Sequence, residues 1–508
     1  MVIAQSEAAD IASMAADALS DALLNLGRPS VKPYWPGIAI TLAAISLLNL
    51  SGDIAAVAAP RPRARPAGRP RAAPRRRRPR AARRHAPRPK APDLYASIAL
   101  ASAVAFVGEL ARCLLALAWY GARRLLRGRD ESERRSVAVY CGFGLIPGER
   151  REWSGASLAG GIGGSEQCAI RLSRALAARG EDVVVYCACG APHVVDGVRY
   201  EPTASFDPWA AYAALVVWRL PQFLLAQRLA GFGGLAVRTR SVAYWIHDGA
   251  YLELLRRGGA PFLGVVRFAV RGADAVVFPS EAMRAAQYAA LFPAGGGDDV
   301  GRMATVVPHG VPRYSAAGGE GDREDGWLLW PVSVERGLDA LLAALPRLRA
   351  AVEGRGGDFK LVVCHHEDGY HARGGSRREL PADVVFAGML PPRELAALYR
   401  TCALFVFPSS VPEAFSLSSW ECALHGVVPV AYSLGALEAL GAVGCPLARP
   451  GDLDGLVDAA AALLADPAAC ARTRADVVGR ARRAALDWDA AADVWREDVL
   501  RPRRGCKV

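Results

Sequence analysis

The sequence predicts an α/β protein built from two doubly wound parallel sheets. Short apolar runs alternate with amphipathic stretches of helical period, which is typical of parallel strands joined by crossover helices. The pattern occurs twice, on either side of a polar segment, residues 315–326, that is rich in Gly, Glu and Asp. A chain of 508 residues is also long enough for several domains.

The first set of elements opens with a buried strand over 136–141. A glycine loop, Gly160-Gly-Ile-Gly-Gly-Ser-Glu166, and an amphipathic helix to Arg179 follow. The glycines do not have the Gly-x-Gly-x-x-Gly spacing of dinucleotide-binding loops, so a nicotinamide cofactor is not predicted. We expect Gly163, Gly164 and Ser165 to let a ligand approach the backbone; the alternative is a merely flexible loop.

Residues 403–432 are the most informative stretch of the second set. The apolar run 403–407 predicts a strand, a helix is expected from about Ser416 to Leu424, and 427–432 predicts the next strand. This is a parallel βαβ unit, and ligands of open α/β sheets bind beyond the carboxyl ends of the strands.

Two acidic residues flank the start of that helix, Glu413 before it and Glu421 inside it. A helix N-terminus offers unpaired N–H groups to a phosphate or diphosphate. A carboxylate one turn further along can accept hydrogen bonds from both hydroxyls of a ribose. The pair therefore suits a nucleotide joined through a diphosphate to another group, with two ordinary surface acids as the alternative.

The same residues resemble a known family. Pro412-Glu-Ala-Phe-Ser416, followed by Glu421-Cys-Ala-Leu-His-Gly-Val-Val-Pro-Val430, is similar to the signature of retaining GT-B glycosyltransferases, family 4 in particular. The resemblance extends over about residues 136–500. It implies the GT-B fold, in which two Rossmann-like domains face a cleft, and transfer of a sugar from a nucleoside-diphosphate sugar with retention of anomeric configuration.

The resemblance also implies roles for single residues. Glu413 and His247 would position the donor sugar, and Glu421 would grip the ribose. The donor's diphosphate and its surroundings would involve Arg336, Ser416, Leu417 and Gly435, and the opposite, acceptor-side loop would be Gly163, Gly164 and Ser165. Ala414 and Ser416 stand where the family usually has glycines, and Pro331 where it often has a second basic residue.

The expected substrate is a nucleotide sugar, and no cofactor or metal is expected. The class of the acceptor, a glycan, a lipid or a protein, stays open. A polar cluster, His365-His-Glu-Asp368 with His371, offers metal-ligand types, but adjacent histidines at a strand end point apart, which favours a polar loop.

Two other kinds of function stay open. One is another GT-B activity, such as a nucleotide-sugar epimerase, or a phosphorylase, against which the near-absence of lysine argues. The other is a non-catalytic scaffold whose basic segment contacts membrane or nucleic acid. Deletion of residues 1–135 would abolish a scaffold function and spare an enzyme.

Residues 1–135 form an N-terminal extension in this interpretation. It contains an apolar segment at 37–59, whose uninterrupted run is short for a membrane span, and another at 94–120, expected to be an interfacial helix, a hairpin-like anchor or a plain packed helix. Between them lies a Pro/Arg-rich segment at 60–93, expected to be disordered. The predicted domains that follow are 136–318, 325–485 and a C-terminal helix and tail, 486–508, that crosses back onto the first domain.

The basic charge is local. Residues 61–90 hold thirteen Arg and one Lys with no acid, so of the net charge of +12 only 12 − 14 = −2 remains for the rest of the chain. Nucleic-acid binding by the globular part is therefore not expected. The eleven cysteines show no zinc-finger spacing and are expected to be buried free thiols. We expect a cytoplasmic protein, with membrane association through the extension as an open alternative.

Overall fold

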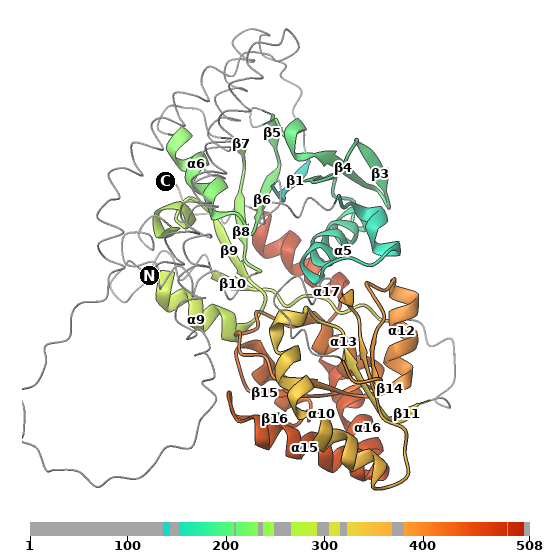
Figure 1. Cartoon of the computed structure of the whole chain (residues 1–508). Helices are drawn as coiled ribbons and strands as arrows, with labels where there is room; N and C mark the ends of the chain where they lie inside the picture. Colours follow the sequence, from blue (N-terminus) through green and yellow to red (C-terminus); the bar gives the residue numbers. More distant parts are fainter. Residues whose placement is uncertain are drawn as a thin grey trace, which may run out of the picture.

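The computed structural model describes residues 136–142, 152–207, 210–231, 237–247, 266–291, 304–314, 323–367, 380–484 and 486–501. The apolar segments 37–59 and 94–120 and the basic segment 60–93 lie outside the described residues. The described part forms two parallel sheets, one above the other in Figure 1, each with helices against it. The predicted fold class, two Rossmann-like α/β sheets, is confirmed.

The first sheet has eight strands in the order β10-β9-β8-β6-β1-β2-β4-β3. The pairs are parallel except β3 with β4, and Val137 of β1 lies level with both Val183 of β2 and Ala214 of β6. Its strands are β1 (Val137–Tyr140), β2 (Val183–Cys187), β3 (His193–Val195), β4 (Val198–Pro202), β6 (Ala214–Trp218), β8 (Val242–Trp245), β9 (Ala275–Phe278) and β10 (Ala304–Val306). A separate two-stranded sheet pairs β5 (Ala211–Tyr212) with β7 (Arg238–Thr239).

The second sheet has six parallel strands in the order β13-β12-β11-β14-β15-β16. All six residues of β14 are buried, because neighbouring strands cover its edges and helices cover its faces. The strands are β11 (Glu324–Trp330), β12 (Lys360–Val363), β13 (Val384–Phe386), β14 (Cys402–Phe407), β15 (Val428–Tyr432) and β16 (Leu447–Ala448).

Helices cover both faces of the second sheet. α10 packs with α15 on one face, and α13 packs with α12 and α16 on the other. The principal helices are α5 (Gly164–Ala178), α6 (Pro221–Gly231), α9 (Glu281–Leu291), α10 (Leu338–Glu353), α12 (Pro392–Thr401), α13 (Leu417–His425), α15 (Leu453–Ala465), α16 (Pro467–Arg483) and α17 (Trp488–Val494). Since α10 follows β11 and α13 follows β14, the chain leaves these two neighbouring strands toward opposite faces, which opens a crevice between them.

The end of the chain returns to the first sheet, where α17 packs against α5 (Figure 1). Arg179, at the end of α5, pairs with Asp489 at 2.7 Å and Asp493 at 2.5 Å. A one-turn π-helix, Trp495–Val499, follows α17, and the Trp495 ring lies 5.1 Å from that of Trp245. This returning segment therefore ties the end of the second sheet's chain to the first sheet.

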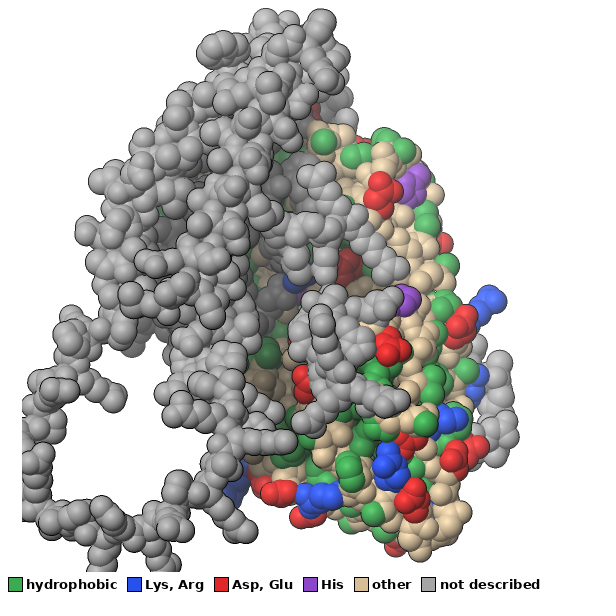
Figure 2. All heavy atoms as spheres, viewed as in Figure 1, with side chains coloured by type: hydrophobic (Ala, Val, Ile, Leu, Met, Phe, Trp, Pro, Cys, Tyr) green, Lys and Arg blue, Asp and Glu red, His purple; other side chains and the backbone are tan. Residues whose placement is uncertain are grey.

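The visible surface carries mixed charge. In Figure 2, acidic and basic side chains are interspersed with apolar ones over the lower, described part of that face, in agreement with the near-neutral charge outside the basic segment. In the part of the chain that the structure describes, none of the helices combines the length and the apolar character that a membrane span requires. The nine described cysteines are all buried and free.

Candidate active site between the two sheets

Glu413 and Arg336 form an ion pair at the crevice of the second sheet. Glu413 follows β14, and Arg336 ends a short 3₁₀ turn, Val334–Arg336, after β11. One guanidinium nitrogen, Nη1, lies 2.5 Å from both carboxylate oxygens of Glu413, and Ser409 Oγ donates to Oε1 at 3.4 Å. Glu413 is 5% exposed, whereas the Arg336 side chain is 40% exposed. Arg336 thus anchors the buried acid, and its own side chain stays partly exposed.

Gly435 fixes the backbone of Glu413 from the other side. The two residues form a parallel β-bridge, and Ala436 N donates to Glu413 O at 2.9 Å. Gly435 has φ 63° and ψ −133°, and a Cβ there would lie 2.7 Å from Glu413 O. Only glycine can adopt this backbone conformation and also fit so close to Glu413 O. The structure therefore places Gly435 against the acid.

Ser416 and Leu417 lie at the N-terminus of α13. Ser416 is the N-cap, but it takes φ 62° and its side chain does not cap the helix; its Oγ pairs with Ser419 Oγ at 2.7 Å. A serine thus holds the left-handed conformation that glycine adopts more easily. The Ser416 side chain thus leaves the N–H groups at the start of α13 uncapped, and the Ser416 carbonyl accepts from Ser419 N at 3.1 Å.

The glycine loop lies opposite this helix start. Gly163 is the N-cap of α5, and a Cβ on Gly164 would lie 4.0 Å from Leu417 Cδ2. A Cβ on Gly161 would lie 2.6 Å from Leu390 O, in the second sheet's half of the chain. The residues 163–165 at the start of α5 and the N-terminus of α13 therefore form two walls that face each other. Ser280 Oγ adds a direct link by donating to Ala414 O at 2.7 Å.

Glu421 is buried inside the second sheet's side of this junction. It is 3% exposed, and its carboxylate accepts a hydrogen bond from Tyr399 at 2.8 Å and from Tyr314 at 3.3 Å. Burial raises the pKa of Glu421, while the two tyrosine hydroxyls and the charge of Arg171 oppose that shift. Both oxygens are thus already engaged, which the sequence did not predict. A ribose diol would have to displace a tyrosine hydroxyl, and Tyr314 makes the longer bond.

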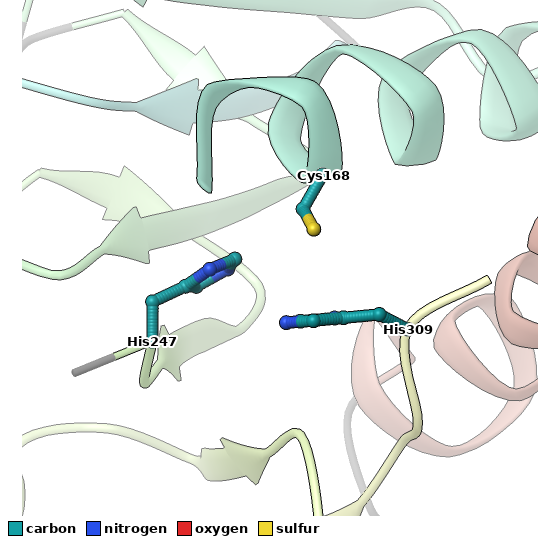
Figure 3. A group of neighbouring side chains, drawn as sticks. All are labelled: Cys168, His247 and His309. Atoms are coloured by element: carbon teal, nitrogen blue, oxygen red, sulfur yellow. The ribbon is translucent and has the colours of Figure 1, made fainter. Parts of the chain in front are cut away.

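His247 lies at the carboxyl end of β8 with Cys168 and His309 beside it (Figure 3). It is 8% exposed, and its Nε2 has no hydrogen-bond partner among the residues that the structure describes. Its ring stacks on His309 at 4.7 Å, and His309 in turn lies 5.0 Å from Phe415, next to the start of α13. Burial lowers the pKa of His247 well below its usual value and that of His309 to about 3, so both rings are neutral near pH 7.

Cys168 and His309 were not predicted as site residues. Cys168 lies on the predicted helix after the glycine loop, but its convergence with His309 depends on tertiary packing. Of the loop considered for a metal, His365 is half-buried with Nδ1 3.2 Å from His366 O, His366 is exposed, and His371 lies outside the described residues. Among the described residues, converging metal-ligand atoms are found in Cys168, His247 and His309.

Comparison with known proteins agrees with this geometry. Residues 162–292 match the family model described as "Glycosyltransferase Family 4", and residues 328–466 match that described as "Glycosyl transferases group 1". The first match contains Gly163, Ser165 and His247. The second contains Arg336, Glu413 and Glu421.

The chain belongs to the family 4 glycosyltransferases. The resemblance that residues 412–430 carry is thereby confirmed, and with it the enzyme class, a glycosyltransferase of a retaining family.

Two curated proteins are similar to part of this glycosyltransferase. It is 33% identical over 177 residues to the glycogen synthases of two Mycobacterium tuberculosis strains, a match that covers 34% of this chain and 41% of the relatives. The match thus spans about two fifths of the curated relatives' length.

Solved structures agree in fold. A sucrose-phosphate synthase from Thermosynechococcus elongatus is 17% identical, with a TM-score of 0.54, over 72% of this chain and 99% of that one. An α,α-trehalose-6-phosphate synthase from Burkholderia multivorans is 16% identical, with a TM-score of 0.50, over 72% and 98%.

Proposed function

We propose that this glycosyltransferase moves a sugar from a nucleoside-diphosphate sugar to a glycan, lipid or protein acceptor, with retention of anomeric configuration. The observation that carries the proposal is the close approach of two segments to the start of α13. A Cβ on Gly164 would lie 4.0 Å from Leu417 Cδ2, and His309, which stacks on His247, lies 5.0 Å from Phe415. The start of α13 offers positive partial charge to a diphosphate. On the opposite side, the glycine loop lets a sugar approach the backbone closely, and His247 offers a ring nitrogen to it.

The diphosphate leaves as an anion, so catalysis requires donors aimed at it in the transition state. We assign this role to the backbone N–H groups of the N-cap Ser416 and of Leu417, and to the partly exposed Arg336 side chain. Arg336 has a second role, because it neutralises Glu413 and holds it at the sugar position. Backbone contact from Gly435 fixes the same acid.

The sugar would lie between Glu413 and His247, which position it. His247 Nε2 is buried without a partner, and a sugar hydroxyl would supply one. Neither residue is assigned as a covalent nucleophile; the leaving phosphate helps to deprotonate the acceptor on the same face of the sugar. Gly163, Gly164 and Ser165 would line the acceptor side.

Glu421 would bind the ribose once the nucleotide displaces Tyr314. The carboxylate lies within the first half of α13, and the 3.3 Å bond from Tyr314 is the weaker of its two. Exchange of one hydroxyl for another conserves the number of hydrogen bonds to the buried acid, so the displacement costs little. Tyr399 would stay in place.

The nine buried free thiols suit a reducing compartment, so we place the enzyme in the cytoplasm. Residues 1–135 would serve as a contact to the membrane surface and not as part of the catalytic unit. Their deletion is expected to leave donor hydrolysis intact; loss of all function would favour the scaffold alternative.

A panel of nucleotide sugars tests the proposal. The full chain is incubated with each, and released nucleoside diphosphate is measured alongside Glu413→Gln and a matched surface change, Glu394→Gln. We expect release from one nucleotide sugar, its loss in Glu413→Gln and its retention in Glu394→Gln. Equal release by the wild type and Glu413→Gln would contradict the role of Glu413, and no release from any donor would contradict the activity.

A further inference from the structure

Cys168, His247 and His309 form a compact group of nitrogen and sulfur ligands. Cys168 comes from α5, His247 follows β8 and His309 follows β10, and Figure 3 shows the thiol and both rings turned toward one another. One ligand atom from each residue lies within 4.8 Å of the other two. The exposed fractions are 2%, 8% and 5%, so water competes little for these atoms.

The group has an unmet bonding need. Among the described residues His247 Nε2 has no hydrogen-bond partner, although buried polar atoms in folded proteins are nearly always paired. The His247 ring, which faces a thiol and a second imidazole, therefore has a buried nitrogen that a metal ion could bind.

The spacing suits a tetrahedral ion after small movements. Zn–S and Zn–N bonds of about 2.3 and 2.0–2.1 Å place neighbouring ligand atoms roughly 3.3–3.8 Å apart. The present separations, at most 4.8 Å, need only side-chain rotations to reach that range.

The surrounding charges are mixed. Electrostatic interactions link Cys168 to the acids Glu421 and Glu166 and to Arg171, and link His247 to Arg219. The acidic groups therefore offset the guanidinium groups, so a divalent ion would meet neighbouring charges of both signs.

We propose that Cys168, His247 and His309 bind one Zn²⁺ ion, or another late first-row divalent ion, and that this ion excludes the donor sugar. A set of one thiolate and two imidazoles selects such ions over Mg²⁺ or Ca²⁺. On binding, the Cys168 thiol gives its proton to solvent and the two neutral imidazoles release none. The exclusion of the sugar rests on the proposed function, because it requires that His247 also contacts the donor sugar. The metal site itself does not rest on the proposed function.

Co²⁺ titration of the full chain tests the metal site without any activity. We expect one Co²⁺ bound per chain, with a thiolate-to-cobalt charge-transfer band in the near ultraviolet. Cys168→Ala is expected to abolish that band and to weaken Co²⁺ binding about 10–100-fold. The matched control is Cys470→Ala, an equally buried thiol on α16, which should bind as the wild type does.

Thermal unfolding of each variant shows that it is folded. An unchanged band in Cys168→Ala, or the absence of any cobalt–thiolate band in the wild type, overturns the site.

A second arm tests the exclusion of the donor. Zn²⁺ should inhibit release of nucleoside diphosphate competitively with the nucleotide sugar, and Cys168→Ala should need at least tenfold more Zn²⁺ for the same inhibition. Competitive inhibition that Cys168→Ala does not relieve overturns the assignment to these residues. If Co²⁺ binds through Cys168 but Zn²⁺ leaves turnover unchanged, the exclusion of the sugar is overturned and the metal site stands. If no donor turns over, the proposed function fails, and the Co²⁺ titration still decides whether the metal site exists.

Discussion

Tyr314 holds one oxygen of the carboxylate that the proposed donor needs. Its hydroxyl lies 3.3 Å from Glu421 Oε1, whereas the fully buried Tyr399 lies 2.8 Å from Oε2. Burial and the charge of Glu421 raise the pKa of the Tyr314 hydroxyl, so it stays a neutral donor. Tyr314 therefore competes with a ribose hydroxyl for the same oxygen.

Tyr314→Phe is expected to tighten nucleoside-diphosphate binding. Removal of the competing hydroxyl spares the nucleotide the loss of one hydrogen bond to Glu421, about 0.5–1.5 kcal/mol, or roughly 2–10-fold in Kd. Isothermal titration calorimetry measures the change. The comparison variant, Tyr399→Phe, should not tighten binding, because Tyr399 is not displaced; tighter binding in Tyr399→Phe alone would refute the displacement of Tyr314.

Sequence patterns and the family resemblance predicted candidate site residues but not their side-chain partners. Glu413, Arg336 and Gly435 are near the expected helix start because strand ends and turns dictate backbone position. The ion pair of Arg336 with Glu413, and the two tyrosines on Glu421, depend on side chains that meet only after folding. A single sequence carries no spacing rule for such contacts.

At the scale of elements, α17 and the turn after it join the two halves through different kinds of contact. Arg179 makes solvent-exposed ion pairs to Asp489 and Asp493, whose side chains are 79% and 55% exposed. Trp495 is 1% exposed and packs edge-on to Trp245. Exposed ion pairs contribute little to stability, whereas a buried aromatic side chain contributes several kcal/mol.

Trp495→Ala is therefore expected to lower the free energy of unfolding by about 3–5 kcal/mol. Arg179→Ala should lower it by less than about 1 kcal/mol, since surface pairs are screened by solvent. Denaturant unfolding of both variants measures the order. A larger loss in Arg179→Ala would mean that charge, and not apolar burial, attaches the returning segment.

Most strands and crossover helices followed from apolar runs bounded by glycine or proline, as in β14 and β15. The hairpin of β3 and β4 was not predicted, although its Asp196-Gly197 turn carries a signal, with φ values of 52° and 77°. Its strands are short and partly exposed, so their apolar pattern is weak. Local pattern strength thus decided which elements could be predicted.

At the scale of the whole molecule, two buried neutral histidines couple stability to pH. The pKa of His309 falls to about 3 on folding and that of His247 falls well below 6.5. Between these values and 6.5 the unfolded chain binds more protons than the folded one, so stability decreases as pH falls below about 6.5. Each histidine contributes a slope of at most about 1.4 kcal/mol per pH unit.

His309→Asn is expected to reduce that slope by up to this amount between pH 6 and pH 5, because one of the two titrating groups is gone. Denaturant unfolding of the wild type and the variant at several pH values measures it. The raised pKa of Glu421 acts in the opposite direction but cancels in the difference, since both proteins contain it. Parallel stability curves for the two proteins would show that His309 is not a buried neutral group.

The proposed function depends on the two facing walls, residues 163–165 and the N-terminus of α13. The alternation of strands and helices predicted the two sheets but not how closely these walls approach each other. Calorimetric titration of a panel of nucleoside diphosphates into the wild type, Arg336→Gln and Arg347→Gln tests them most directly. Arg347, on the outer side of α10, pairs with Asp454 at 2.5 Å and serves as the matched control. We predict that one nucleoside diphosphate binds, and that Arg336→Gln alone loses about 10–100-fold in affinity, as expected for a charge-assisted contact. Equal affinity in all three proteins, or no binding of any nucleoside diphosphate, would contradict the account.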